Sequence, residues 1–318
     1  MSSMFMDKDI VRHGPIDKGP ILAIILRAKG DAMKTLYSAT AALALLVAVT
    51  SAGSAAGSST LTFMFKNVNI HGAKSTVVTG INNAGVMVGN YTDQSGVSHG
   101  FRLSNGKATI IDDPASTVTR PSGINKAGVI VGYYSKSGRL QAFEYNQGKF
   151  TDIGPAGASA SGAFGINDQQ EITGEFFDSS GAEHGFLLKA GRYTTLDVPG
   201  ATFTQAYGIN DSSTITMIWG DSAGQVESSI YRNSKYTSIN VPGATSSYAH
   251  SINRAGDVIF TWLDSSHNFH GALLHSGKYY DFEDPHGNSA GNGINDHHMI
   301  VGAYLISKQE FGGYQASY

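Results

Sequence analysis

The sequence predicts an all-β fold, a single six-bladed β-propeller, and three observations support this prediction. First, the phrase Gly-Ile-Asn and one variant of it recur six times, in steps of 43, 42, 43, 43 and 42 residues. A fixed period in this range indicates a repeat architecture. Second, each unit holds four short apolar segments separated by turn residues, which is typical of a propeller blade. Third, the last unit lacks a fourth strand, while one strand stands alone before the first unit. The six copies begin at Gly80, Gly123, Gly165, Gly208, Ser251 and Gly293.

The composition fits short strands joined by tight turns. Charged residues make up only 15% of the 318 residues, and the chain contains 39 glycines, 15 tyrosines and 15 phenylalanines. Because a repeat unit cannot bury a core alone, we expect the array to behave as one cooperative body. The chain has no cysteine. This excludes disulfides, thiolate metal sites and a cysteine nucleophile.

The charge balance argues against a nucleic-acid partner. The chain has a net charge of −3, and residues 1–56 hold six of its 22 basic and four of its 25 acidic residues, so the remainder has a net charge of −5. The sequence shows no basic stripe that would neutralise phosphates.

In each unit the first strand ends at the Gly-Ile-Asn phrase. An asparagine can hydrogen-bond its own backbone and glycine supplies positive φ. The asparagine, followed three residues later by a glycine in three units (Gly85, Gly128 and Gly256), therefore predicts a tight turn. An apolar second strand follows and completes a hairpin, and we expect this strand to be buried. Eleven residues after the initial glycine each unit carries an aromatic residue: Tyr91, Tyr134, Phe176, Trp219, Trp262 and Tyr304.

A second turn then leads to two further strands. The third strand opens with His-Gly-Phe or a variant, at His99, Gln141, His184 and His270. The fourth strand ends at a proline, which cannot continue a ladder. These prolines are Pro114, Pro155, Pro199, Pro242 and Pro285.

The two ends of the repeat array predict how the ring closes. The lone strand spans Thr62 to Ile70, and the final strand spans Gly312 to Tyr318. Pairing these two strands gives six complete blades and removes the open edges that invite aggregation.

The N-terminus has the pattern of an export signal. Lys34 precedes an apolar run from Leu36 to Val49, and small residues follow, with cleavage expected after Ala55 or Ala56. This is the layout of a secretory signal peptide over residues 33–56. The run is shorter than the roughly 20 residues that span a bilayer, although an uncleaved anchor helix is the alternative. Residues 1–32 do not fit a signal peptide, and we interpret them as a non-native upstream extension. The propeller then occupies residues 57–318.

The His-Gly-Phe phrase, together with Gly-Ile-Asn-x-x-Gly, resembles the motifs of the HAF-type extracellular repeat family. The resemblance covers residues 60–318, but units four and six depart from it with Glu227-Ser228-Ser229 and Phe311-Gly312-Gly313. It implies a secreted bacterial propeller-like protein. It implies no established activity and supplies no catalytic residue.

The aromatic residues at the end of the second strands are the first candidates for ligand binding. They could stack on sugars, or they could pack between neighbouring blades. Trp219 and Trp262 are the only tryptophans, and tryptophan is enriched at binding hot spots. We expect both on the face that carries the Asp-Ser-Gly turns and the Pro-Gly-Ala loops. The other members of this candidate ligand-binding set are Tyr91, Tyr134, Arg120, His250 and His286.

The sequence predicts no metal or cofactor. Seven of the eleven histidines follow residue 249, but their spacing matches no metal signature, and solvated surface histidines are the simpler interpretation. Asp93, Asp178, Asp221 and Asp264 recur at one offset. A calcium loop gathers several oxygens within a dozen residues, so we expect these aspartates to cap turns instead.

No catalytic motif is present, so the sequence leaves enzymatic activity open. We expect a secreted, monomeric binding or scaffold protein whose partner is a polysaccharide or a surface protein. The alternative is a polysaccharide-acting hydrolase or lyase on the same fold, for which Glu175 and Glu227 are the candidate acids. A third hypothesis is a structural surface protein without a small-molecule site. We expect no membrane span after signal cleavage.

Overall fold

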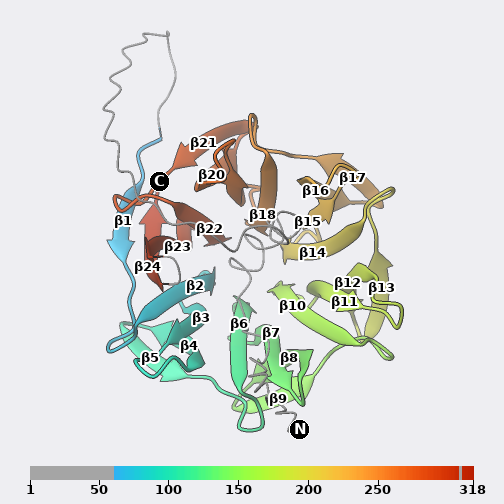
Figure 1. Ribbon diagram of the computed structural model, residues 1–318, viewed down its shortest axis with the longest axis horizontal. Helices are drawn as coiled ribbons and strands as arrows, with labels where there is room; N and C mark the ends of the chain where they lie inside the picture. The colour runs from blue at the N-terminus through green and yellow to red at the C-terminus, as the bar shows by residue number, and fades with distance from the viewer. Residues whose placement is uncertain (1–60, 308–309) are drawn as a thin grey trace, which may run out of the picture. The chain divides into compact units, whose positions relative to one another are not determined.

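Six four-stranded antiparallel sheets surround a central axis in the computed structural model, which describes residues 61–307 and 310–318 (Figure 1). The predicted six-bladed β-propeller is therefore confirmed. The predicted upstream extension and signal peptide, residues 1–32 and 33–56, lie outside the described residues. Each blade follows the chain outward from the axis, so its first strand lies innermost (Figure 1).

The strand bounds repeat closely from blade to blade. Blade 1 contains β2 (Ser75–Ile81), β3 (Met87–Thr92), β4 (Ser98–Ser104) and β5 (Lys107–Ile110); blade 2 contains β6 (Val118–Ile124), β7 (Ile130–Lys136), β8 (Arg139–Asn146) and β9 (Lys149–Asp152); blade 3 contains β10 (Ala160–Ile166), β11 (Ile172–Phe177), β12 (Glu183–Lys189) and β13 (Arg192–Leu196). Blade 4 contains β14 (Phe203–Ile209), β15 (Ile215–Gly220), β16 (Val226–Arg232) and β17 (Lys235–Ser238); blade 5 contains β18 (Ser246–Ile252), β19 (Val258–Leu263), β20 (Phe269–His275) and β21 (Lys278–Phe282); blade 6 contains β22 (Ser289–Ile294), β23 (Met299–Ser307), β24 (Glu310–Ser317) and β1 (Met64–Asn67).

The N-terminal strand closes the ring, as the sequence predicts. Strand β1 pairs antiparallel with β24, with Met64 opposite Ser317 and Asn67 opposite Tyr314. β1 is shorter than the predicted strand from Thr62 to Ile70, and a turn farther along bonds the amide of Ala73 to the carbonyl of Ile70. Blade 6 thus contains strands from both ends of the described chain.

The hydrophobic core is divided into six clusters, one at each junction between neighbouring blades. Between blades 1 and 2, for example, Val88 packs with Ile130, Tyr134 and Phe143, and all four side chains are at most 1% exposed. Burial of this apolar surface is the main force that holds the blades together.

The Gly-Ile-Asn phrase ends each innermost strand, and its asparagine performs two tasks. The Oδ1 atom of Asn82 accepts the amides of Ala84 and Val86 and so fixes its own turn. Its Nδ2 atom donates to the carbonyl of Asn125 in the next blade at 3.0 Å. The same bond between neighbouring blades recurs at all six junctions, with lengths of 3.0 to 3.4 Å, and the last joins Asn295 to Asn82. A closed ring of six hydrogen bonds, the asparagine ring, therefore encircles the axis.

The glycine of the phrase is required by close approach of the next blade. A Cβ atom on Gly165 would lie 2.4 Å from the carbonyl oxygen of Tyr207, and one on Gly123 would lie 2.8 Å from that of Phe164. The pairing register also shifts just before this glycine in every blade, which marks a β-bulge. Bulges bend a strand and redirect one side chain.

Substitution of one ring asparagine tests how much the ring stabilises the fold. We expect Asn82→Ala to lower the free energy of unfolding by about 3 kcal/mol, because it removes the bond to blade 2 and leaves the buried amide of Val86 without its acceptor. Chemical denaturation of both proteins measures this difference. Asn146→Ala, at the exposed end of β8 and outside the ring, is the control for loss of an asparagine. An equal, small effect of both substitutions would show that the ring contributes little.

Candidate functional site

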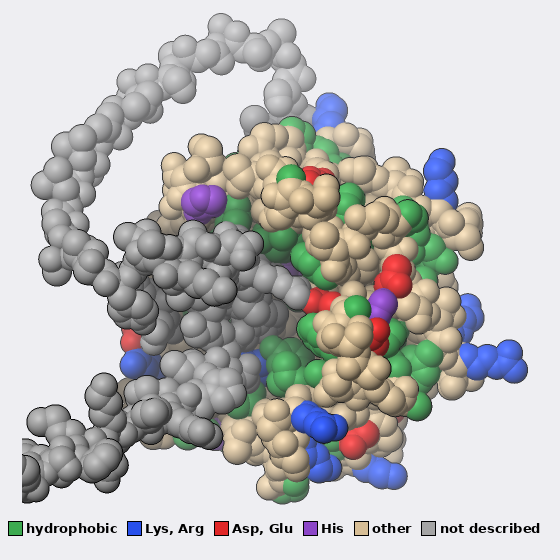
Figure 2. All heavy atoms as spheres, turned by 45° about the vertical axis from the view of Figure 1, so that its right-hand side comes forward, with side chains coloured by type: hydrophobic (Ala, Val, Ile, Leu, Met, Phe, Trp, Pro, Cys, Tyr) green, Lys and Arg blue, Asp and Glu red, His purple; other side chains and the backbone are tan. Residues whose placement is uncertain are grey.

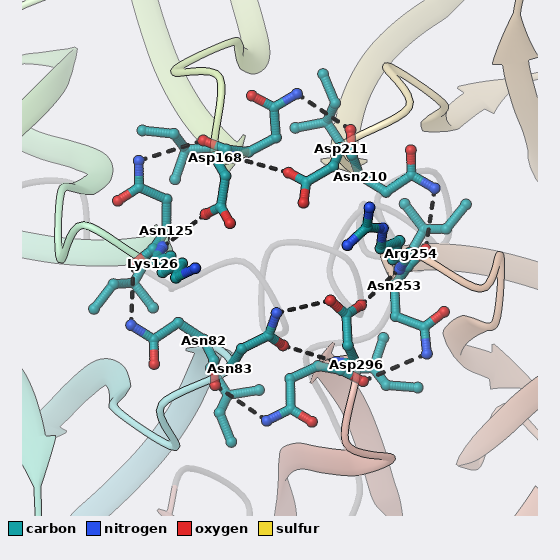
Figure 3. A pocket seen from close by; sticks show the side chains of 18 residues that line it. Asn82, Asn83, Asn125, Lys126, Asp168, Asn210, Asp211, Asn253, Arg254 and Asp296 are labelled. Carbon is teal, nitrogen blue, oxygen red and sulfur yellow. Dashed lines mark hydrogen bonds between the residues drawn. The ribbon is translucent and has the colours of Figure 1, made fainter.

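A pocket opens on the axis at the end where the innermost strands turn into the second strands (Figure 3). Its empty volume is about 460 Å³, part of which is open to solvent. Each blade contributes the isoleucine and asparagine of its repeated phrase and the residue that follows. The isoleucines and asparagines are the same in every blade, so the following residues alone distinguish one side of the pocket from another.

These following residues form a polar rim around the pocket, which we call the axial rim: Asn83, Lys126, Asp168, Asp211, Arg254 and Asp296.

Four members of the rim are oriented by bonds from one blade to the next. The Asp168 carboxylate accepts the amide of Lys126 at 2.8 Å, and the Asp211 carboxylate accepts the amide of Asp168 at 3.0 Å. Asp296 accepts the amide of Arg254 at 2.8 Å, while its second oxygen accepts Nδ2 of Asn83 at 2.7 Å. In Figure 3 Lys126 and Arg254 lie on opposite sides of the ring. Asp168 and Asp211 are thus held in fixed directions by one oxygen each, and Asp296 is held by both oxygens.

The rim can act as a recognition surface for a polar molecule. It presents carboxylate acceptors, an amide that both donates and accepts, and two cationic donors around one hollow. Sequence reasoning did not identify these residues, although they directly follow the invariant asparagines. The available signal was that this position is polar in all six units and differs in charge among them.

The aromatic residues that end the second strands lie in the clusters between blades. Trp219 packs with Leu196 and Val198 of the preceding blade, and Trp262 packs with Val241 of its preceding blade. Packing between neighbouring blades was one of the two interpretations of these residues, and stacking on sugars was the other. A role of these tryptophans in ligand binding stays a prediction.

The remaining predicted site residues are distributed over several blades. Tyr91 stacks on His99 at 5.0 Å between ring centres, and Tyr134 is 1% exposed and donates to Asp152. His286 stacks on Tyr304 at 4.3 Å.

Arg120 and His250 lie on the innermost strands β6 and β18, and both are buried. Burial lowers the pKa of His250 to about 3. The structure therefore does not bring the predicted ligand-binding residues together in one pocket.

The recurrent aspartates cap turns, as expected. Asp93 accepts the amides of Ser95 and Val97, and Asp221 accepts those of Ala223 and Gln225. Among residues 61–307 and 310–318, no group of three His, Asp or Glu side chains is placed to hold a metal ion.

The histidines of the His-Gly-Phe phrase bridge two acidic residues in three blades. His99 contacts Asp112 through Nδ1 at 2.7 Å and Asp93 through Nε2 at 3.5 Å. Equivalent bridges join His184 to Asp197 and Asp178, and His270 to Glu283 and Asp264. Each bridge ties the turn after the second strand to the end of the fourth strand. The histidine of the motif thus has a structural role within its blade.

The two candidate acids for catalysis contact different partners. Glu175 on β11 bonds to Gln205, and Glu227 on β16 bonds to Asn240. Burial, with the nearby charge of Asp221, raises the pKa of Glu227.

Comparison with known proteins identifies the fold alone. No family model matches the chain, and no curated protein matches it in sequence. A solved structure described as TolB from Agrobacterium tumefaciens is 12% identical with a TM-score of 0.57, covering 77% of this chain and 91% of that one. The lectin of Aleuria aurantia, solved with Fucα1-6GlcNAc, is 12% identical with a TM-score of 0.51, covering 76% and 91%. TolB from Acinetobacter baumannii is 12% identical with a TM-score of 0.53, covering 77% and 64%.

The face shown in Figure 2 has its lysine and arginine side chains spread along the margin of the molecule.

In the described part of the chain, no helix has the length and apolarity needed to cross a membrane.

The acid–histidine bridges predict a stability maximum in mildly acidic solution. A hydrogen bond from Ser95 lowers the pKa of Asp93 to about 2, and one from Ser180 does the same for Asp178, so their contribution is present above about pH 4 and lost as the pH falls toward 2. A hydrogen bond to Asp112 raises the pKa of His99 from 6.5, so its contribution is present below about pH 6.5 and lost as the pH rises above this value. The melting temperature should therefore be highest between about pH 4 and 6.5.

The alkaline decline should become shallower in His99→Gln, because glutamine does not titrate. His71→Gln removes an exposed histidine and serves as the control. A melting temperature that follows the same pH profile in wild type and in His99→Gln would contradict this origin.

Proposed function

We propose that this chain is a secreted binding protein that holds the end of a polysaccharide in the axial pocket. The observation that carries the proposal is the axial rim, where a uniform hydrogen-bonded frame presents side chains of different charge around one hollow. Repeated residues build the frame, and the rim residues vary among units that otherwise agree. Such variation in a fixed frame favours recognition of an asymmetric ligand.

The chemistry of the rim matches a sugar. A sugar ring carries hydroxyl groups around its perimeter, and each hydroxyl both donates and accepts hydrogen bonds. Asp168 and Asp211 offer acceptors on neighbouring blades, while Arg254 offers donors. The bond from each backbone amide to Oδ1 holds these carboxylates before a ligand arrives, which reduces the entropy lost on binding.

The fold comparison supports a binding role for this architecture. The Aleuria aurantia lectin shares the overall fold and was solved with a fucose-containing disaccharide. At 12% identity this likeness bears on the fold, and the choice of ligand rests on the rim side chains.

Two conservative substitutions test the site. We expect the double variant Asp168→Asn and Asp211→Asn to bind its polysaccharide about tenfold or more weakly, because each asparagine keeps an acceptor for the backbone amide but loses the charge. Calorimetric titration with a panel of polysaccharides and cell-wall fractions measures the affinity. Asp113→Asn, which changes a capping aspartate in a loop of blade 1, is the matched control.

If the rim variant and the control bind the polysaccharide with equal affinity, the polysaccharide does not bind in the axial pocket. A saturable change in tryptophan fluorescence that is lost in Trp219→Ala or Trp262→Ala would instead place the ligand on the face predicted from the aromatic residues. Failure of every glycan to bind, together with capture of a surface protein that needs the rim charges, would replace the sugar by a protein partner.

We also propose that the chain is exported, in keeping with its resemblance to HAF-type extracellular repeat proteins. The support is the pattern of residues 33–56, in which an apolar run precedes small residues. N-terminal sequencing of exported protein should give a mature chain that starts at Ala56 or Gly57. A mature chain that begins before Met33 would contradict both the signal and the upstream-extension interpretation.

A further inference from the structure

A second set of variable side chains lies along the innermost and second strands, before the bulge and away from the asparagine ring. These positions are the residue three before the repeated glycine and its partner on the second strand. The paired residues in blades 1 to 6 are Val77 and Asn90, Arg120 and Tyr133, Gly162 and Glu175, Gln205 and Ile218, Tyr248 and Thr261, and Ala290 and Ala303.

The polar members of this set are concentrated in adjacent blades. Arg120, Glu175, Gln205 and Tyr248 belong to blades 2 to 5, whereas blade 1 contributes Val77 and Asn90 and blade 6 contributes only alanines. The strand frame is the same in all six blades, so this grouping is a property of the side chains and not of the fold.

One amide holds two carboxylates together within this set. The Nε2 atom of Gln205 in blade 4 donates to Glu175 at 2.5 Å and to Glu183 at 2.7 Å, and both glutamates belong to blade 3. Glu183 is 7% exposed. Two carboxylates that share one donor repel each other, so a cation placed between them gains favourable energy from both.

Aromatic rings line the same region from the bulge positions. The Phe164 and Tyr207 rings stack with centres 4.3 Å apart, and His250 meets Tyr207 edge-on at 5.0 Å. Burial and then the charge of Glu175 raise the pKa of Tyr207, which places this ring within the field of the paired carboxylates. Blades 1, 2 and 6 carry small polar residues at this position. The aromatic rings therefore lie in blade 3, which carries the carboxylates, and in the next two blades.

A buried histidine nitrogen and an unfilled backbone position complete the region. His250 is 6% exposed, and its Nε2 atom has no hydrogen-bond partner among the described residues. Gly162 lies between Tyr133 and Phe164, and a Cβ there would make only ordinary contacts of 3.4 to 3.7 Å. Unlike the glycines of the repeated phrase, Gly162 is not required by packing.

We propose that these side chains form a second ligand site that binds an amino sugar through its protonated amine. The amine lies against Glu175 and Glu183, and the sugar ring lies against the aromatic surface of Tyr207 and its neighbours. The two neighbouring carboxylates favour a cation. Aromatic faces add to this preference through cation–π attraction. This site uses none of the residues of the axial rim, so it does not depend on the function proposed for the rim.

Calorimetric titration of the full chain with a glucosamine tetramer at pH 6 tests the site, with the N-acetylglucosamine tetramer as the matched neutral probe. The glucosamine tetramer should bind, and the acetylated one should bind at least about tenfold more weakly, because acetylation removes the charge. Glu175→Gln and Glu183→Gln should each reduce the affinity for the glucosamine tetramer by about tenfold or more. The rim variant Asp168→Asn and Asp211→Asn should leave this affinity unchanged.

Melting curves establish which variants are folded. If one glutamate variant fails to fold, the affinity of the other for the glucosamine tetramer tests the proposal. Equal binding of both tetramers, or affinity unaffected by the glutamate substitutions, would overturn the proposal. Absence of binding of the glucosamine tetramer would overturn it as well. If polysaccharide binding that depends on the rim remains in that case, the function proposed for the axial pocket stands alone.

Discussion

The structure depends on one side chain per blade, the asparagine that ends each innermost strand. Its carbonyl oxygen fixes the turn of its own blade and its amide nitrogen binds the backbone of the next, so local and long-range geometry are set by the same group. Each bond adds only about 1 kcal/mol in net terms. Six of them in a closed cycle fix the spacing of the blades around the axis.

This constraint explains the other residues of the repeated phrase. For an asparagine to reach the next backbone, neighbouring innermost strands must approach closely, and a side chain at the preceding glycine would strike a carbonyl oxygen. Blade 5 carries Ser251 at that position, and its hydroxyl accepts the amide of Ile294 at 3.4 Å. The bulge before the glycine then redirects one residue per blade. A phrase of three residues thus encodes a turn, a packing distance and a contact between blades.

The sequence predicted the features that repeat, because a period, a turn residue and a strand-ending proline act locally. It predicted that each asparagine would bind its own turn, but not that Asn82 would reach Asn125, since that acceptor lies 43 residues away and approaches only when the ring closes. The His99 bridge was missed for a similar reason, as Asp93 and Asp112 come from different turns. The bonds from Gln205 to Glu175 and Glu183 join two blades and occur in only one pair of blades, so no repeated pattern in the sequence predicts them.

Two sets of residues near the repeated phrase differ among the blades: the axial rim and the paired positions before the bulge. At one end of the axis, the residue after each asparagine lines the pocket. In blades 2 and 5 this residue, Lys126 or Arg254, bonds to the next blade through its backbone amide alone. Farther along the innermost strands, the residues before the bulge pair with the second strand of the same blade. Neither set includes an asparagine of the ring or a member of the clusters between blades. A propeller of this kind can therefore change its ligand without changing its fold, and the two proposed sites lie where the structure permits that change.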